Sequence, residues 1–268
     1  FDIQTWSGDG TVRNISHNLG SVAGMIIVKN TSSGSTDWRV YHRGVNGGSS
    51  PQNYSLKLND TAAQGFGALW NTQAPTSTQF TVANDTETNA SGQTYVAYIF
   101  AHNDDDGGFG EPGDQDIIKC GGYSGNGSST GPTVNLGFEP QFLFTKNATT
   151  GGSGKDWVMV DNMRGVATGG NDEYLFANQA NAEASADLYD FNATGFSVKN
   201  GGGSVNGSGD THIYMAIRRG GMQTPTAASS VFEVINPAGS SSTTWSSGNS
   251  SGSLFTDFFL GKPRTSVS

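Results

Sequence analysis

Residues 92–100 read GQTYVAYIF, and residues 209–217 read GDTHIYMAI, 117 positions later in the chain. Both segments follow a turn-forming Gly with β-branched and aromatic residues, which is typical of a β-strand. Successive side chains on a strand point to opposite faces. The two faces of the first segment are therefore Tyr95, Ala97 and Ile99 on one side, and Val96, Tyr98 and Phe100 on the other. Because both faces are apolar, we expect protein to cover this strand on both sides.

The same offset of 117 links other parts of the chain. Residues 6–10 (WSGDG) recur at 123–127 (YSGNG), and the run at 25–29 (MIIVK) recurs at 142–146 (FLFTK). An offset that returns to one value across loops of different length indicates an internal duplication. A third copy starts at the C-terminal end, where residues 258–262 (FFLGK) repeat the run at 142–146.

These matches predict the domain organisation. The expected parts are a first repeat at 1–105, an acidic linker at 106–116, a second repeat at 117–221, a linker at 222–229 and a partial third unit at 230–268. The start of the chain (FDIQ) lacks a Met and a signal-peptide pattern, so we expect a processed chain or a segment of a longer one. The apolar segments at 231–234 and 254–260 are expected to pair with more protein, since bare apolar strand edges invite aggregation.

The fold class follows from the local pattern. Short β-branched or aromatic segments alternate with turns rich in Gly, Asn, Asp and Ser throughout both repeats. We therefore expect an all-β protein with two tandem antiparallel β-sandwiches, of jelly-roll or lectin-like type, and the start of a third.

Composition excludes several classes of protein. The formal net charge is −9, which disfavours binding to nucleic acid. No apolar run approaches about 18 residues, so we expect no membrane insertion. Cys120 is the one cysteine, which excludes an intrachain disulfide and a cysteine-based zinc site.

The linker between the repeats carries a cluster of carboxylates. Asp104, Asp106, Asp114 and Asp116 lie on a glycine-rich segment, and hard cations such as Ca²⁺ bind several oxygen ligands on flexible loops. The spacing does not match an EF-hand. The alternative is a solvated linker that its own charge keeps extended, with no bound cation and no other cofactor.

Two tryptophans are candidates for carbohydrate binding. Trp70 and Trp245 have no clear counterpart in the other repeat and lie near polar, Gly- and Asn-rich segments. An exposed indole can stack on the C–H face of a sugar. Packing against a neighbouring protomer is the competing interpretation. Trp38 and Trp157 match each other in the repeat, each after an Asp, and are expected to pack in the core.

The sequence offers no recognisable catalytic constellation. None of its glutamates forms an evident carboxylate pair, and the histidines show no metal-ligand spacing. His212 stands where the first repeat has Tyr95, so it is expected to be a packed residue. We therefore expect that the protein is not an enzyme and has no catalytic residues.

Several stretches together resemble a known repeat unit. They are YSGNGS at 123–128, LGFEPQF at 136–142, Lys146, Asp156-Trp157, Arg164-Gly165, GSGDTHIYMA at 207–216 and the link RRGGMQTPT at 218–226. This succession resembles a β-rich unit of virion proteins in tailed bacteriophages, especially marine and cyanobacterial ones. The acidic linker departs from that pattern, since the linkers of the similar proteins are commonly less acidic.

The resemblance implies a structural virion protein, as a tail-fibre or tail-associated component on the particle surface. Its expected partners are other copies of itself and other virion proteins, in a symmetric oligomer with a trimer as the default. The alternative is a lectin-like module that binds host surface polysaccharide. A capsid-decoration protein and a depolymerase are further alternatives.

Overall fold

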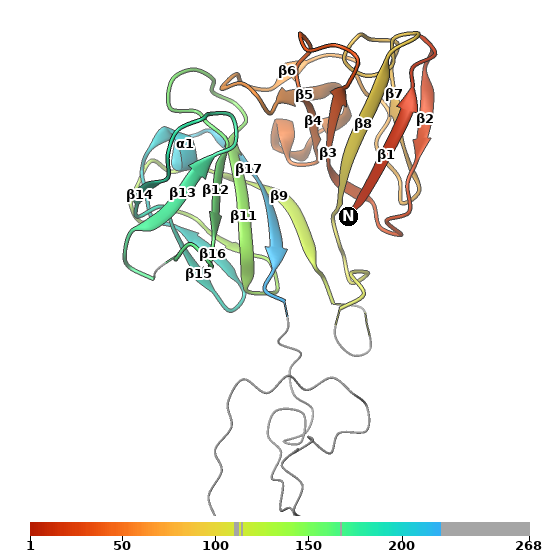
Figure 1. The fold of residues 1–268 in the computed structure, drawn as a ribbon. Coiled ribbons are helices and arrows are strands. Elements are labelled where there is room, and N and C mark those ends of the chain that lie inside the picture. The colour runs from red at the N-terminus through yellow and green to blue at the C-terminus, as the bar shows by residue number, and fades with distance from the viewer. Residues whose placement is uncertain (110–112, 114, 167, 221–268) are drawn as a thin grey trace, which may run out of the picture. The chain divides into compact units, whose positions relative to one another are not determined.

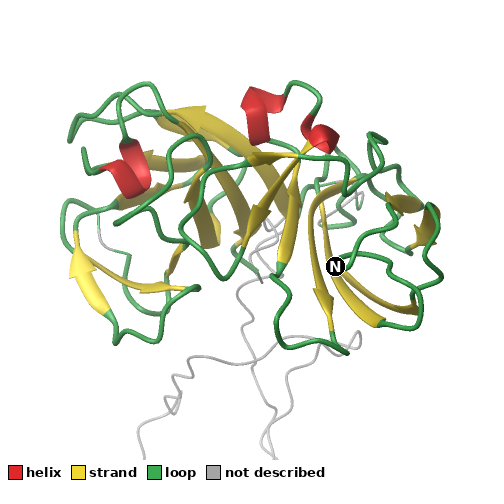
Figure 2. Ribbon diagram, turned by 90° about the horizontal axis from the view of Figure 1, so that it is seen from above, coloured by secondary structure: helices red, strands yellow, loops and turns green. Residues whose placement is uncertain are grey.

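The computed structural model describes residues 1–109, 113, 115–166 and 168–220. The predicted linker at 222–229 and the partial third unit at 230–268 lie outside these residues. The described part is almost entirely strand and loop, with a few short helical turns (Figure 2). Every pairing between its strands is antiparallel, which confirms the predicted all-β class. Within the described residues, no helix has the length and apolar character needed to cross a membrane.

The first half of the described chain forms two sheets. A six-stranded sheet has the order β1-β8-β3-β4-β5-β6, and β2 pairs with β7 in a smaller sheet. The elements of this half are β1 (Asp2–Ser7), β2 (Arg13–Ser16), β3 (Ala23–Asn30), β4 (Arg39–His42), η1 (Val45–Gly48), η2 (Pro51–Asn53), β5 (Tyr54–Lys57), β6 (Gly65–Phe66), β7 (Gln79–Val82) and β8 (Thr94–Ala101).

The second half repeats this plan. Its larger sheet has the order β9-β17-β11-β12-β13-β14, and a three-stranded sheet has the order β10-β16-β15. The elements are β9 (Ile118–Ser124), β10 (Thr133–Asn135), β11 (Pro140–Asn147), β12 (Val158–Asp161), β13 (Asp172–Phe176), β14 (Ala184–Ala186), β15 (Tyr189–Asn192), β16 (Gly195–Val198), α1 (Gly203–Asn206) and β17 (Thr211–Arg218).

The two larger sheets share one strand order and one register. Strand β9 takes the place of β1, β17 that of β8, and β11 that of β3. Trp6 lies opposite Tyr95 in the first sheet, and Tyr123 lies opposite His212 at the matching point of the second. Figure 1 shows the two sets of strands, red to yellow and green to blue. The offset of 117 residues therefore corresponds to a duplicated fold.

Each half has its own core between its larger and smaller sheet. Trp6, Phe80 and Tyr95 lie in the first core, and Tyr123, Phe196 and Tyr214 lie in the second. A Trp or Tyr from the edge strand thus packs edge-on against a Phe of the smaller sheet in both halves. Such edge-to-face pairs add about 0.5–1.5 kcal/mol to the energy of apolar burial.

A third apolar layer joins the halves. It contains Met25, Val40 and Leu56 from the first sheet and Phe144, Trp157 and Met215 from the second. Residues Phe1–Gly220 accordingly form one compact unit. The layer also covers the second face of β8, where Tyr98 and Phe100 pack against it while Tyr95, Ala97 and Ile99 are buried in the first core. The prediction that this strand is covered on both faces is confirmed.

Gly44 makes a close backbone approach between the halves. A Cβ atom at this position would lie 2.7 Å from the carbonyl oxygen of Gly121 on β9, a backbone atom that cannot rotate away. We expect Gly44→Ala to lower the free energy of unfolding by about 1–3 kcal/mol, the usual cost of overpacking. Gly34→Ala is the matched control, because nothing lies within 4 Å of its added Cβ. Urea denaturation of both variants checks this, and equal midpoints would contradict the close approach.

Candidate functional site

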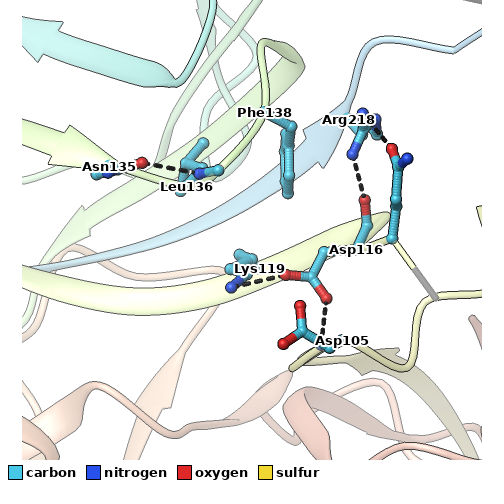
Figure 3. A pocket seen from close by; sticks show the side chains of 9 residues that line it. Asp105, Asp116, Lys119, Asn135, Leu136, Phe138 and Arg218 are labelled. Carbon is cyan, nitrogen blue, oxygen red and sulfur yellow. Dashed lines mark hydrogen bonds and ion pairs between the residues drawn. The ribbon is translucent and has the colours of Figure 1, made fainter. Parts of the chain in front are cut away.

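A polar hollow of about 480 Å³ lies where the linker, β9, β10 and the end of β17 meet (Figure 3). Asp105 and the linker residues Gln115 and Asp116 contribute two carboxylates and an amide, the strands contribute two cations, and the loop after β10 contributes an apolar wall. The lining residues are Asp105, Gln115, Asp116, Lys119, Asn135, Leu136, Gly137, Phe138 and Arg218.

Asp116 is the central acceptor of this hollow. Its Oδ2 lies 2.7 Å from Lys119 Nζ, and its Oδ1 accepts the backbone N–H of Asp105 at 2.8 Å. The residue is only 8% exposed, so its charge depends on these partners rather than on water. Figure 3 shows Asp105 and Lys119 approaching the carboxylate from different segments of the chain. The hydrogen bond from Asp105 holds the residue before the linker against Asp116, the last residue of the linker.

Arg218 at the end of β17 closes the other side. Its guanidinium donates to Gln115 Oε1 at 2.8 Å and to the carbonyl oxygen of Asp116 at 3.3 Å. The same group lies 4.6 Å from the ring centre of Phe109 and 5.6 Å from that of Phe138. Cation–π contacts of this kind contribute about 0.5–2 kcal/mol each. Arg218 is therefore held in place by residues of the chain itself.

The polar contacts of this hollow hold the linker against β9 and β17. Lys119 is paired with Asp116, Arg218 is hydrogen-bonded to Gln115 and to the backbone of Asp116, and the lining residues include no Ser, Cys or His that could act as a nucleophile or base. Asn135 remains as an exposed amide at the rim, so the hollow can offer hydrogen bonds to a small polar molecule. The paired cations chiefly tie the linker to β9 and β17.

The three predicted calcium ligands that the structure describes, Asp104, Asp106 and Asp116, are not assembled into a metal site. Asp104 is exposed, and Asp106 accepts hydrogen bonds from Asn103 and from the backbone of Asp104. Burial acts to raise the pKa of Asp106, but the hydrogen bonds from Asn103 and Ser21 bring the net pKa below its usual value. Asp116 is engaged with Lys119, and Asp114 lies outside the described residues. No group of three or more His, Cys, Asp or Glu residues that could hold a metal occurs in the described part of the chain.

The prediction of a sugar-binding ring at Trp70 is wrong. Trp70 is 1% exposed and packs edge-on against Tyr41 in the first core. Its indole N–H donates to the carbonyl oxygen of Tyr54 at 3.0 Å. A ring covered on both faces has no surface for a sugar to stack on. Trp245, the other candidate, lies outside the described residues.

The expected packing residues are where the repeat placed them. Trp157 is 1% exposed in the layer between the halves, and Trp38 is half-buried against the same layer, where it stacks on Tyr98. His212 is fully buried and stacks on Tyr123 with ring centres 5.1 Å apart. The interpretation of Trp157 and His212 as packed residues is confirmed.

Sequence reasoning missed a buried cation. Lys146 is fully buried, and its Nζ donates to the carbonyl oxygens of Asn147 at 2.8 Å and of Thr61, in the other half, at 3.2 Å. Burial lowers the pKa of Lys146 to about 8, against the raising effect of Asp156 and Asp60. The signal was a Lys at the end of an apolar run in both repeats, at positions 29 and 146.

Because Lys146 is buried, we expect the free energy of unfolding to rise in mildly alkaline solution. The pKa of this group is about 8 in the folded chain and near 10.5 in the unfolded chain, so the folded state is penalised while the lysine is protonated. We expect the free energy of unfolding to gain about 2 kcal/mol from this group between pH 8 and pH 10. The difference in unfolding free energy between the wild type and Lys146→Met should show this rise. Lys29→Met, at the half-buried matching position, should keep it; a rise that survives in Lys146→Met would contradict the assignment.

The comparisons with known proteins concern the same residues. No curated protein and no solved structure matches the chain significantly. The model of a family described as a domain of unknown function (DUF7483) matches residues 1–219, which include all the strands of both halves. Because this match spans more than half of the 268 residues, the chain belongs to that family of domains of unknown function.

Proposed function

We propose that this chain is a structural protein of the virion of a tailed bacteriophage, a tail-fibre or tail-associated component exposed on the particle. The observation that carries the proposal is the construction of residues Phe1–Gly220, in which two copies of one sandwich share a third apolar layer. Closely packed interiors have low compressibility and transmit strain. A unit built in this way suits a component that must hold its shape.

The polar hollow supports a role without catalysis. Its cations are paired with linker groups, and its lining residues hold no nucleophile next to a base. The resemblance of residues 123–226 to repeats of phage virion proteins points in the same direction. We propose that the hollow fastens the linker rather than binds a substrate.

The alternative of a lectin-like module receives less support from the described residues. Trp6, Trp70 and Trp157 are at most 8% exposed. Trp38 is half-buried, with one contact to Tyr98 and Lys29 Nζ 6.0 Å from its ring centre. None of these rings offers the open platform that sugar stacking requires. No observation in the described chain favours this function over the structural one.

The proposal is tested on intact particles. Antibodies raised against the full chain are applied to gradient-purified virions of the phage whose genome encodes it, and gold label is located by electron microscopy. Label on the tail or its fibres is expected, and antibody absorbed with the purified chain should remove it. Absence of the chain from purified particles, checked by mass spectrometry, would overturn the virion role. Label confined to the capsid would overturn the tail assignment.

A further inference from the structure

The outer face of the first sheet is covered by protein at Met25, whereas the outer face of the second sheet is open at the matching residue, Phe142. Met25 pairs with Phe100 on the outer face of the first sheet and is 1% exposed, because the second half packs over it. The matching pair in the second sheet is Phe142 with Ile217. These two side chains are only half-buried, at the margin of the layer between the halves.

The open position forms an apolar hollow of about 610 Å³. Phe142, Ile217 and Met163 supply its apolar lining, and the Met163 side chain is 83% exposed. The Arg164 guanidinium at the rim donates to Asp161 and to Glu183, both at 2.8 Å. Since the Arg164 guanidinium is already paired, the hollow presents an apolar floor without an unpaired cation among its lining residues, which favours an apolar protein surface as its occupant.

The strand that packs over Met25 in the first half indicates which kind of surface could pack over Phe142 in the second. Ile118 and Cys120 of β9 lie in the layer between the halves and are 6% and 1% exposed. Strand β9 is the counterpart of β1, and the residues of the first half at these positions are Phe1 and Ile3. They are 60% and 49% exposed. Among the described residues, the repeat thus leaves one covering strand and one receiving surface without a partner.

Phe1 and Ile3 face the correct side of the sheet. Ile3 lies opposite Tyr98, and the ring of Phe1 lies 4.9 Å from that of Phe100. Tyr98 and Phe100 are the residues of β8 that pack against the layer between the halves. The exposed apolar side chains at β1 therefore continue the face that already packs against protein.

We propose that a second copy of this chain packs its β1, through Phe1 and Ile3, against the hollow formed by Phe142, Ile217 and Met163. The contact brings together, between two chains, the strand and the sheet face that correspond to β9 and Met25 within one chain. It is heterologous, because one copy supplies the strand and the other the hollow, so copies assemble into a ring, an open filament or a two-fold pair that uses both contacts. Gln141 stands where the first half has Gly24, and a Cβ at Gly24 would lie 2.7 Å from the Cβ of Cys120, so the contact between copies is wider than the approach of β9.

The test measures the association of the full chain by sedimentation equilibrium. The wild type is expected to assemble at about 50 µM, and Ile3→Lys and Met163→Glu are each expected to weaken association by at least about tenfold. Mixing the two variants should restore assembly, because the introduced ammonium group of one copy then meets the introduced carboxylate of the other, while the reverse contact is unchanged. Phe66→Lys is the matched control, since Phe66 is 78% exposed on β6, outside both surfaces.

Each outcome decides the proposal. A monomeric wild type would overturn it, whatever else covers Phe142. Assembly that Ile3→Lys abolishes but Met163→Glu leaves intact would show that β1 pairs with itself, and would also overturn it. Loss with both single variants and recovery in the mixture is the result that supports the heterologous contact.

Discussion

Lowering the pH from 7 to 5 is expected to remove about 5 kcal/mol from the free energy of unfolding of this chain. Three histidines that the fold shields from water cause the loss. Burial lowers the pKa of His42 to about 3 and the pKa values of His102 and His212 to about 4. The unfolded chain binds a proton at each of these positions below about pH 6.5, whereas the folded chain does not. The two fully buried histidines, His42 and His212, each cost about 2 kcal/mol by pH 5, and the half-buried His102, which water partly screens, costs about 1 kcal/mol. A whole domain has only about 5–15 kcal/mol to lose.

The direction of the effect is fixed by the direction of the pKa shifts. A group whose pKa is depressed on folding contributes stability that is complete above its unfolded pKa and is lost as the pH falls towards its folded pKa. The window begins at about pH 6.5 and extends to about pH 4 for His102 and His212 and to about pH 3 for His42. Carboxylates whose pKa values are lowered, including Asp37 and Asp210, lose their contribution as the pH falls through 3.8. Between pH 7 and pH 5 the histidines therefore dominate the loss, and both groups contribute at lower pH.

His42 shows why the folded chain rejects the proton. Its Nδ1 accepts the backbone N–H of Gly44 at 3.0 Å, so its Nε2 carries the hydrogen and donates to the carbonyl oxygen of Tyr214 at 2.9 Å. The residue is 1% exposed and joins the first half to the second. A proton on Nδ1 would break the first hydrogen bond and place a charge in a site without an acceptor for it.

Thermal denaturation between pH 7.5 and pH 4.5 tests this prediction. The melting temperature should fall by about 15 °C or more by pH 5. His42→Gln keeps an amide donor and acceptor without a titratable group, so the slope of unfolding free energy against pH should drop by about 1.4 kcal/mol per unit between pH 6 and pH 5. A melting temperature that stays constant down to pH 5 would contradict the burial of neutral histidines.

The fold was predictable where the information is local and repeated. Alternation along residues 92–100 predicted a strand with two apolar faces, and the matching segments 117 residues away predicted a duplicated plan. Both survive in the structure because strand pairing depends on the period of side chains along the backbone. The same residues could not predict which part of the protein packs against the second face of this strand. Two apolar faces require two partners but do not say that the partner of Tyr98 is the other half of the chain.

The candidate sites were less predictable because they depend on contacts that are distant in sequence. Trp70 lies among polar residues, but the fold of its loop carries the ring under Tyr41 and its N–H to the backbone of Tyr54. The neighbouring residues in the sequence are polar, and they do not reveal that the Trp70 ring is buried in the core. Lys146 presents the same difficulty, since the carbonyl oxygen of Thr61 that receives its Nζ lies 85 positions away.

Trp157→Ala is expected to lower the free energy of unfolding by about 3–5 kcal/mol, the usual cost of removing a buried Trp. The ring stacks on Phe144 with centres 4.9 Å apart, and its Nε1–H donates to the carbonyl oxygen of Lys57 at 2.8 Å. Since Lys57 belongs to the first half, the indole links the two halves by packing and by a hydrogen bond. The variant should lose both, and urea denaturation measures the loss.

The duplication supplies the control for this variant. Trp38 is the matching residue of the first half, is half-buried and stacks on Tyr98 at the margin of the same layer. Because it leaves a smaller cavity, Trp38→Ala should cost about 1–2 kcal/mol. Calorimetry adds a second readout: the wild type should unfold in one transition, and Trp157→Ala should separate the two halves into two. Equal losses for the two tryptophans, with one transition retained in both variants, would mean that the shared layer does not depend on Trp157. A larger loss with two transitions would assign the coupling of the halves to this single indole.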